Sequence, residues 1–150
     1  MEWVILILVV AVLGYAIYVY NNLIRNRQLV EEGWSGIDVQ LKRRADLIPN
    51  MLETVKGYMA HERETLQALT DARAAVQAAQ NASPGERGQA EGLLSGALGR
   101  LFAVAEAYPD LKANTNFLEF QTALQIVEDE IQLSRRYYNG AVRNLNIAVE

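Results

Sequence analysis

The chain of 150 residues contains no cysteine, one histidine and three prolines. Its net charge is only −4. The absence of cysteine excludes disulfide bonds, thiolate catalysis, and zinc or iron–sulfur sites with cysteine ligands. A nucleic-acid-binding domain would carry a basic face and a high isoelectric point. The mild acidity of this chain therefore predicts no nucleic-acid partner.

The single histidine limits the metal sites that a helical protein of this kind could hold. Di-iron bundles need Glu-x-x-His on two helices, and the zinc-protease pattern needs two histidines. We therefore expect His61 to be an exposed or hydrogen-bonded helical residue. Gly33-Trp34-Ser35-Gly36 resembles a nucleophile elbow, but Ile37 stands where that motif needs glycine. The sequence predicts no catalytic site, cofactor or metal; an enzyme site shared between subunits is the remaining enzymatic alternative.

The N-terminal segment is the longest apolar run. Every residue from Trp3 to Tyr20 is apolar except Gly14, and about 20 such residues span the hydrocarbon of a bilayer as a helix. A cleaved signal peptide would need a basic start and an Ala-x-Ala site, which are missing. Residues 1–24 are therefore predicted to be a transmembrane anchor that contacts lipid through residues 3–24. Because Arg25 and Arg27 follow it, the positive-inside rule favours an outside N-terminus and a cytoplasmic domain.

Residues 25–150 carry helical periodicity and no sustained strand alternation. A heptad seam typical of a coiled coil starts where the apolar run ends, and Gly33 and Gly36 mark its predicted bend. Asp46 is predicted to cap a second helix with Pro49 in its first turn, continuing to Val76. The seam is formed by Leu23, Val30, Trp34, Ile37, Leu41 and Ile48.

Two further helices complete the expected fold. Residues 81–88 form the predicted loop. The third helix carries Leu94 to Tyr108, and the fourth begins near Asn114. Short connections between amphipathic helices favour an antiparallel arrangement. The expected class is all-α, with an N-terminal transmembrane helix that runs into an antiparallel four-helix bundle of long helices at residues 25–150.

Charged residues also occupy core-spaced positions, namely Glu62, Arg73, Glu128 and Arg135. One interpretation is a buried layer of ion pairs that fixes the register of the helices. Because unpaired charges are costly to bury, we favour the other interpretation, in which these residues flank the core and extend into water.

Several segments resemble the LemA family. They are residues 20–23 (YNNL), 34–50 (WSGIDVQLKRRADLIPN), 55–58 (VKGY), His61-Glu62, 104–114 (VAEAYPDLKAN) with Phe117, and Arg135 with Tyr138-Asn139. The resemblance implies a single-pass bacterial membrane protein with an N-terminal anchor, a helical bundle and no established enzymatic activity. One branch of that family is associated with building magnetosome membranes, and other members occur near membrane proteases and stress functions.

The motif residues are candidates for helix caps, inter-helix hydrogen bonds and assembly contacts. The alternative is that most of them serve folding alone, because helix ends need caps. The candidates are Trp34, Asp38, Arg44, Asp46, Pro49, Asn50, Tyr58, Glu62, Glu106, Tyr108, Pro109, Lys112, Asn116, Phe117, Glu128 and Arg135.

The function we expect is a non-enzymatic scaffold in the bacterial inner membrane. Anchoring raises the effective concentration of the chains, so that weak side contacts build a homo-oligomer that organises or shapes the membrane and its proteins. The alternative is a membrane-tethered adaptor or sensor that holds a soluble or membrane partner, for example a protease or stress-response protein.

Overall fold

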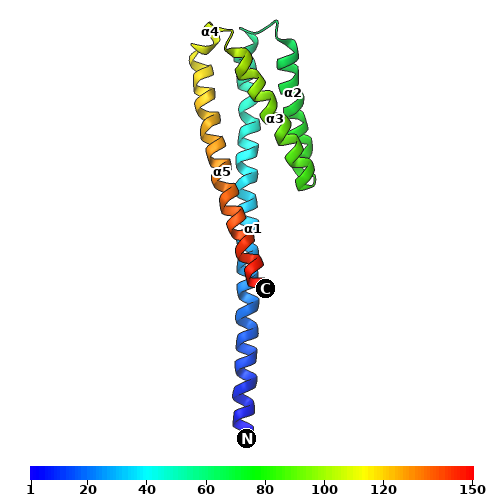
Figure 1. Cartoon of the computed structure of the whole chain (residues 1–150), viewed down its shortest axis with the longest axis vertical. Helices are drawn as coiled ribbons and strands as arrows, with labels where there is room; N and C mark the ends of the chain where they lie inside the picture. Colours follow the sequence, from blue (N-terminus) through cyan, green and yellow to red (C-terminus); the bar gives the residue numbers. More distant parts are fainter. The chain divides into compact units, whose positions relative to one another are not determined.

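The computed structural model describes residues 1–150, and every regular element in it is helical (Figure 1). This confirms the predicted all-α class with long helices. The chain divides into two compact units, one formed by Met1–Val39 with Ile131–Glu150 and the other by Gln40–Glu130. The elements are α1 (Glu2–Lys56), α2 (Arg63–Ala78), the 3-10 turn η1 (Ala79–Asn81), α3 (Pro84–Ala105), the short α4 (Pro109–Lys112) and α5 (Thr115–Val149).

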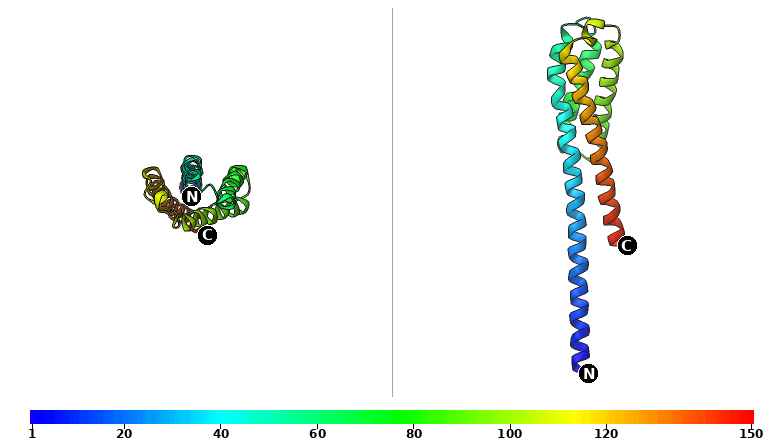
Figure 2. Two further views of the ribbon diagram at one scale, coloured as in Figure 1. Left: turned by 90° about the horizontal axis from the view of Figure 1, so that it is seen from above. Right: turned by 90° about the vertical axis from the view of Figure 1, so that its left-hand side faces the viewer.

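One hydrophobic core holds the unit Gln40–Glu130 together. Its side chains come from the α1 segment after Gln40, from α2, from α3 and from the α5 segment before Glu130. Successive long helices run in opposite directions in this unit (Figures 1 and 2). Four helical segments therefore pack antiparallel around a shared core. The largest fully buried side chains are Phe117, Ile48, Met51, Met59, Leu69, Leu94, Leu101 and Leu111.

The start of the last long helix matches the prediction, since α5 begins at Thr115, next to the predicted Asn114. The third helix ends at Ala105, so Tyr108, predicted to belong to it, lies in the connection and precedes α4. The Asn114 side chain accepts a hydrogen bond from the Phe117 backbone N–H at 3.1 Å, which caps α5. The predicted loop at residues 81–88 is too long. Ser83 and Glu86 form a capping box, so α3 already begins at Pro84.

The prediction of a second helix from Asp46 to Val76 is wrong. Residues up to Lys56 belong to α1, a turn follows, and α2 begins at Arg63. Met59 keeps the helical spacing of the apolar residues but lies in this turn, where it is fully buried. Apolar spacing therefore continued across a chain reversal, because a buried turn residue and a buried helix residue share the same preference for a core.

In the unit formed by Met1–Val39 and Ile131–Glu150, the part of α1 around Gly33 packs against the end of α5. A Cβ on Gly33 would lie 3.0 Å from the Tyr138 Cα, and the Trp34 and Tyr138 ring centroids are 5.7 Å apart. The helix α1 continues through Gly33 and Gly36 without interruption, so the predicted bend is not a break. The missing side chain at Gly33 instead lets the backbones of α1 and α5 approach closely.

The N-terminal part of α1 is long and apolar enough to cross a membrane. Its most apolar window of 18 residues has a mean hydropathy of 2.5, and none of that window is buried within the chain. This matches the length and composition expected for residues 1–24.

Pro49 lies inside α1 rather than in the first turn of a new helix. Proline has no backbone N–H, so the carbonyl of Ala45, four residues earlier, receives no helical hydrogen bond. The Arg73 side chain of α2 supplies the missing donor, since its Nε lies 3.3 Å from the Ala45 oxygen. Ala45 is 3% exposed, and an unsatisfied carbonyl there would be costly. Arg73 therefore occupies a core-spaced position because its side chain donates the hydrogen bond that the Pro49 nitrogen cannot give to Ala45.

This contact predicts that Pro49 and Arg73 are energetically coupled. Arg73→Met should lower the free energy of unfolding by about 1–3 kcal/mol, because it leaves the Ala45 carbonyl without a donor. In a Pro49→Ala background, the alanine N–H satisfies that carbonyl and the cost of Arg73→Met should fall by about 1 kcal/mol or more. Chemical denaturation of the four proteins of this double-mutant cycle, followed by circular dichroism, measures the coupling. Equal costs in both backgrounds would contradict it.

Candidate functional site

A buried arginine lies among three helices of the unit Gln40–Glu130. Arg44 of α1 is 3% exposed. Its Nη1 donates to Glu128 Oε1 of α5 at 2.8 Å and to Ser95 Oγ of α3 at 3.1 Å. Its Nη2 donates to the carboxylate of Glu91 on α3 and to the Glu91 backbone oxygen at 3.2 Å. We call Arg44, Glu91, Ser95 and Glu128 the Arg44 cluster.

Burial and the neighbouring carboxylates act in opposite directions on the pKa of Arg44. Burial acts to lower the pKa of the Arg44 guanidinium, but the hydrogen bonds and negative charges of Glu128 and Glu91 outweigh it, so the pKa lies above its ordinary value. Arg44 Nε and Glu91 Oε1 are buried without a hydrogen-bond partner. The cluster therefore holds a permanent positive charge between helices, with two carboxylates around it.

The favoured interpretation of the charged seam residues holds only in part for Glu128, whose side chain is 36% exposed but pairs with the buried Arg44. Arg73 makes a hydrogen bond to another helix, and Glu62 makes one between two connections. Glu91 was not among the predicted residues, although the 4/3 spacing of the third helix, extended back from Leu94, reaches it. Its carboxylate can be buried because Arg44 supplies the opposite charge.

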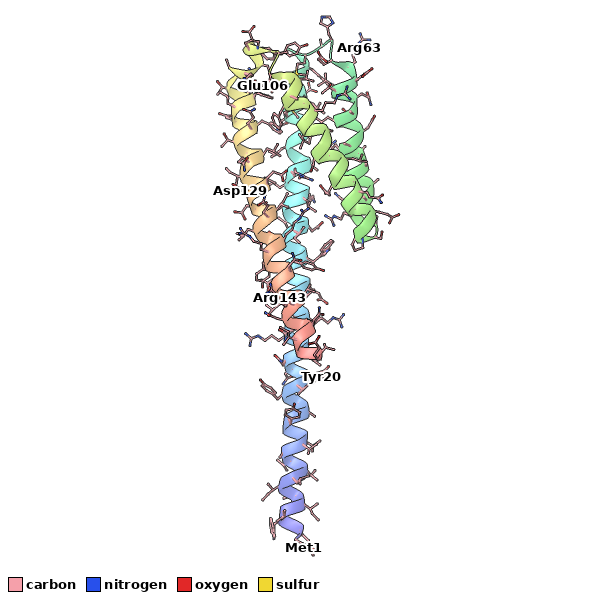
Figure 3. All side chains as sticks on the ribbon, in the orientation of Figure 1. Met1, Tyr20, Arg63, Glu106, Asp129 and Arg143 are labelled. Atoms are coloured by element: carbon pink, nitrogen blue, oxygen red, sulfur yellow. The ribbon has the colours of Figure 1, made fainter.

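Motif residues also tie together the two connections at one end of this unit, where Figure 3 labels Arg63 and Glu106. The Tyr108 hydroxyl donates to Glu62 Oε1 at 2.9 Å, and Asn114 Nδ2 donates to the Tyr58 hydroxyl at 3.1 Å. Lys112 pairs with Glu106 at 2.6 Å within the α3–α5 connection. These bonds join the α1–α2 turn to the segment around α4, so they fix two chain reversals against each other.

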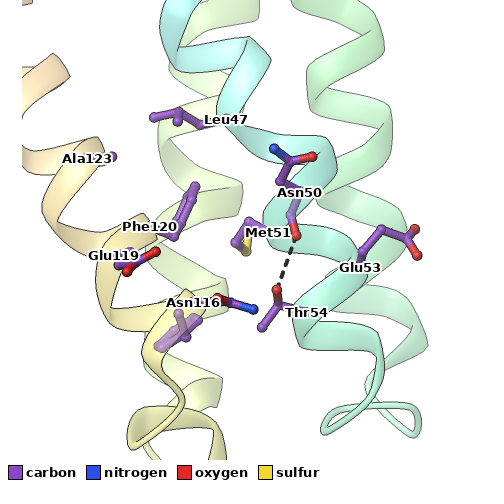
Figure 4. A pocket seen from close by; sticks show the side chains of 10 residues that line it. Leu47, Asn50, Met51, Glu53, Thr54, Asn116, Glu119, Phe120 and Ala123 are labelled. Atoms are coloured by element: carbon purple, nitrogen blue, oxygen red, sulfur yellow. Dashed lines mark hydrogen bonds between the residues drawn. The ribbon is translucent and has the colours of Figure 1, made fainter.

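A cleft of about 430 Å³ lies between α1 and α5 (Figure 4). Its apolar lining includes Met51, Phe117 and Phe120. Two amide side chains, Asn50 and Asn116, line it from the two helices and are exposed. The structure therefore brings three of the predicted candidates, Asn50, Asn116 and Phe117, to one surface feature with both apolar and hydrogen-bonding groups.

A second hollow, which we call the α2–α3 groove, has a volume of about 950 Å³. Ala68, Ala72 and Ala75 of α2 line it together with Gly92, Leu93, Gly96 and Ala97 of α3. Leu93 is 62% exposed. Asp71 and Arg100 supply opposite charges at the same groove. A Cβ on Gly92 or Gly96 would meet nothing within 4 Å.

The other candidates lie apart from these features. Trp34, Asp38 and Arg135 belong to the unit that contains the apolar segment, and Asp46 is exposed on α1. Pro109 is the first residue of α4. Their role as assembly contacts stays a prediction.

His61 is exposed, but it lies in the turn between α1 and α2 rather than in a helix as expected. No group of three or more His, Asp or Glu side chains is arranged to hold a metal ion.

These features define a class of protein: an all-helical chain with a long apolar N-terminal segment and a bundle tied together by polar side chains. The chain belongs to the LemA family, whose pattern matches residues 33–150.

Similar proteins carry LemA and magnetosome names. Protein LemA of Metamycoplasma hominis is 33% identical over 136 residues, which cover 88% of this chain and 61% of that protein. Magnetosome protein MamQ 2 of Paramagnetospirillum magneticum is 26% identical over 94% of this chain and 61% of its own length. Magnetosome protein MamQ of Magnetospirillum gryphiswaldense is 23% identical over 87% and 57%. The chain thus spans less than two thirds of the length of these relatives.

Removing the acid from the buried ion pair of the Arg44 cluster should cost much more stability than removing the acid from an exposed ion pair. Glu91→Ala leaves a buried guanidinium short of its partner and should lower the free energy of unfolding by about 3–5 kcal/mol. The matched control is Glu64→Ala, because Glu64 pairs with Arg100 at 3.4 Å with 91% of its side chain exposed. That control should cost less than about 1 kcal/mol. Denaturant unfolding measures both, and similar costs would contradict a structural role for the Arg44 cluster.

The contribution of the Tyr108–Glu62 hydrogen bond to stability should decrease at alkaline pH. Donation to Glu62, together with burial and the negative charge of Glu62, raises the pKa of Tyr108. A raised pKa in the folded state means that this bond contributes fully below the pKa of unfolded tyrosine, about 10, and is lost as pH rises through the folded value. The stability difference between the natural chain and Tyr108→Phe should therefore be constant near neutrality and shrink at alkaline pH. Denaturant unfolding at a series of pH values measures it.

Glu62→Gln is the control for this pH dependence. It keeps an acceptor but removes the negative charge, so the folded pKa of Tyr108 should lie closer to that of unfolded tyrosine, and the loss of stability should be smaller and complete at lower pH. A Tyr108→Phe difference that does not change with pH would contradict the assignment.

Proposed function

We propose that this protein is a non-enzymatic, single-pass membrane protein that assembles with copies of itself into a scaffold. The apolar start of α1 serves as the anchor, and the bundle contacts other copies. Arg25 and Arg27 after the apolar segment favour an outside N-terminus and a cytoplasmic bundle in a bacterial inner membrane. The similarity to proteins named for the magnetosome supports a role in organising membranes.

The α2–α3 groove is the observation that carries this proposal. Small residues line it, so another helix can approach its floor closely, as in tight helix packing. Leu93 supplies an exposed apolar side chain next to the groove. Asp71 and Arg100 make the groove self-complementary in charge, because a two-fold contact sets the acid of one copy against the base of the other. The small lining residues, the exposed Leu93 and the paired charges of the groove therefore suit contact with a second copy of the chain.

The anchor strengthens such a contact. Chains held in a bilayer share one orientation and a high effective concentration, so a weak lateral contact produces assembly. No catalytic constellation is needed for this activity.

The adaptor alternative is favoured by a different observation, the cleft between α1 and α5. Its apolar lining and its two amides suit a partner segment with one or two apolar side chains and free backbone groups. In the assembly experiment below, a natural chain that is monomeric but carries a stoichiometric partner would favour this alternative over the scaffold.

The groove predicts which substitutions block assembly. Gly96→Leu fills the α2–α3 groove, and since a Cβ there meets nothing within 4 Å, the fold accommodates it. We expect the dissociation constant for self-association to rise about five- to 150-fold, because an overpacked contact costs about 1–3 kcal/mol. Crosslinking in native membranes and mass measurement of the detergent-extracted protein report the assembly state.

The matched control is Gly88→Leu, at another open position of α3 that does not line the groove. This variant should assemble like the natural chain. Both substitutions replace a helical glycine, so helical stability should not fall in either variant. A monomeric natural chain, or equal assembly of the two variants, would contradict the proposal.

A further inference from the structure

The end of α5 lies beside α1 at the place where the apolar segment stops. In the unit Met1–Val39 with Ile131–Glu150, Gly33 faces Tyr138 and Gly36 faces Ser134. The two helices are antiparallel, so equal steps back along α1 and forward along α5 stay level. Leu23 and Ala148 are level by this register, and both are partly buried.

Partial burial along both helices supports this register beyond the closest contact. On α1, Leu23, Asn26 and Val30 are partly buried, at spacings of three and four. On α5, the inward stripe consists of Ser134, Tyr138, Ala141, Leu145 and Ala148. The last two turns of α5 are therefore packed on the α1 segment that directly follows Tyr20.

Arginines are the commonest charged residues in this part of the unit. Between Asn21 and Val39 and between Gln132 and Glu150 they are Arg25, Arg27, Arg135, Arg136 and Arg143, together with the carboxylates of Glu31, Glu32, Asp38 and Glu150. Arg27 forms an exposed ion pair with Glu31 at 3.1 Å, which is a weak interaction in water. The turns nearest the apolar segment thus carry Arg25, Arg27 and Arg143, with Glu150 as the acidic residue among them.

Apolar side chains accompany these arginines on α5. Ile147 is 64% exposed and Val149 is 70% exposed. Ile147 lies one turn beyond Arg143 on the same face of the helix, since residues four apart are neighbours. Figure 3 labels Arg143 on α5 and Tyr20 on α1. Arginine with exposed aliphatic residues is the composition of helices that rest in the interfacial layer of a bilayer.

From these observations we infer that the last two turns of α5 form a second membrane contact, which binds anionic phospholipid headgroups. This inference rests on the proposed function, because it needs Trp3–Tyr20 to span the bilayer. Arg25 then lies roughly 8 Å beyond Tyr20 along α1, and the headgroup layer is about 5–8 Å thick on each side. Arg25 and Arg143 contact lipid phosphates, while Ile147 and Val149 enter the boundary between headgroups and acyl chains.

A single-cysteine probe tests this contact, since the natural chain has no cysteine to compete. The full chain carrying Ile147→Cys or Asn139→Cys is labelled with a polarity-sensitive fluorophore. It is then reconstituted in vesicles of phosphatidylcholine, with or without phosphatidylglycerol. Both positions are exposed, but Asn139 lies two turns farther from the apolar segment and serves as the matched control.

We expect lipids that carry a quencher near the headgroup to quench the probe at position 147 strongly, and more so with phosphatidylglycerol, but to leave position 139 little affected. Changing both Arg25 and Arg143 to Gln should lower the docked-to-undocked ratio roughly fivefold per arginine. Equal quenching at the two positions overturns the inference. So does the same quenching with and without anionic lipid. Shielding of position 147 from water without quenching by lipid points to a protein neighbour and also overturns it.

Flotation of the same vesicles at alkaline pH separates failure of this inference from failure of the proposed anchor. A chain that is washed off the vesicles refutes the anchor itself. A chain that stays with the vesicles while its probe at position 147 behaves like the one at position 139 refutes only the contact by α5.

Discussion

The packing of the unit Gln40–Glu130 depends on the buried guanidinium of Arg44. A guanidinium needs several acceptors in fixed directions, and here they come from Glu91, Ser95 and Glu128 on α3 and α5. Sliding one helix past another by a turn would leave a charge buried without its partner, at a cost of several kcal/mol. The apolar core alone is less selective, because leucine, valine and alanine tolerate neighbouring registers. The Arg44 cluster therefore selects one register among several that the core allows.

Polar side chains have the same effect elsewhere in this unit. Arg73 completes the backbone of α1 at Pro49, and Tyr108 and Asn114 hold the two connections at one end together. Several motif residues, such as Tyr108 and Asn114, thus have a role in folding. A bundle fixed in this way can present a groove of constant shape, such as the α2–α3 groove, to a neighbouring copy. The function we propose uses this rigidity and requires no reactive group.

The sequence predicted some elements well, for physical reasons that differ from one element to the next. The third helix and α5 were predicted because proline, asparagine and tyrosine mark the ends of long amphipathic stretches. The turn after Lys56 was missed because Met59 keeps the apolar spacing although it lies outside a helix. Pro49 was read as the start of a helix, since the donor that replaces its missing N–H comes from Arg73, a residue on another helix. Glu128 was expected to flank the core and extend into water, because its pairing with Arg44 is visible only once the helices are packed.

By itself the sequence determined the helical class, the apolar segment from Trp3 to Tyr20 and the absence of cysteine chemistry, because composition and short-range spacing decide these properties. Membership in the LemA family follows from the order of residues as well. Only the tertiary structure decided that α1 runs through Pro49, that Arg44 is buried against Glu91 and Glu128, and that the end of α5 lies beside the part of α1 that follows Tyr20. Each of these depends on a contact between residues far apart in the chain, and the free energy of such a contact appears only when the helices are packed.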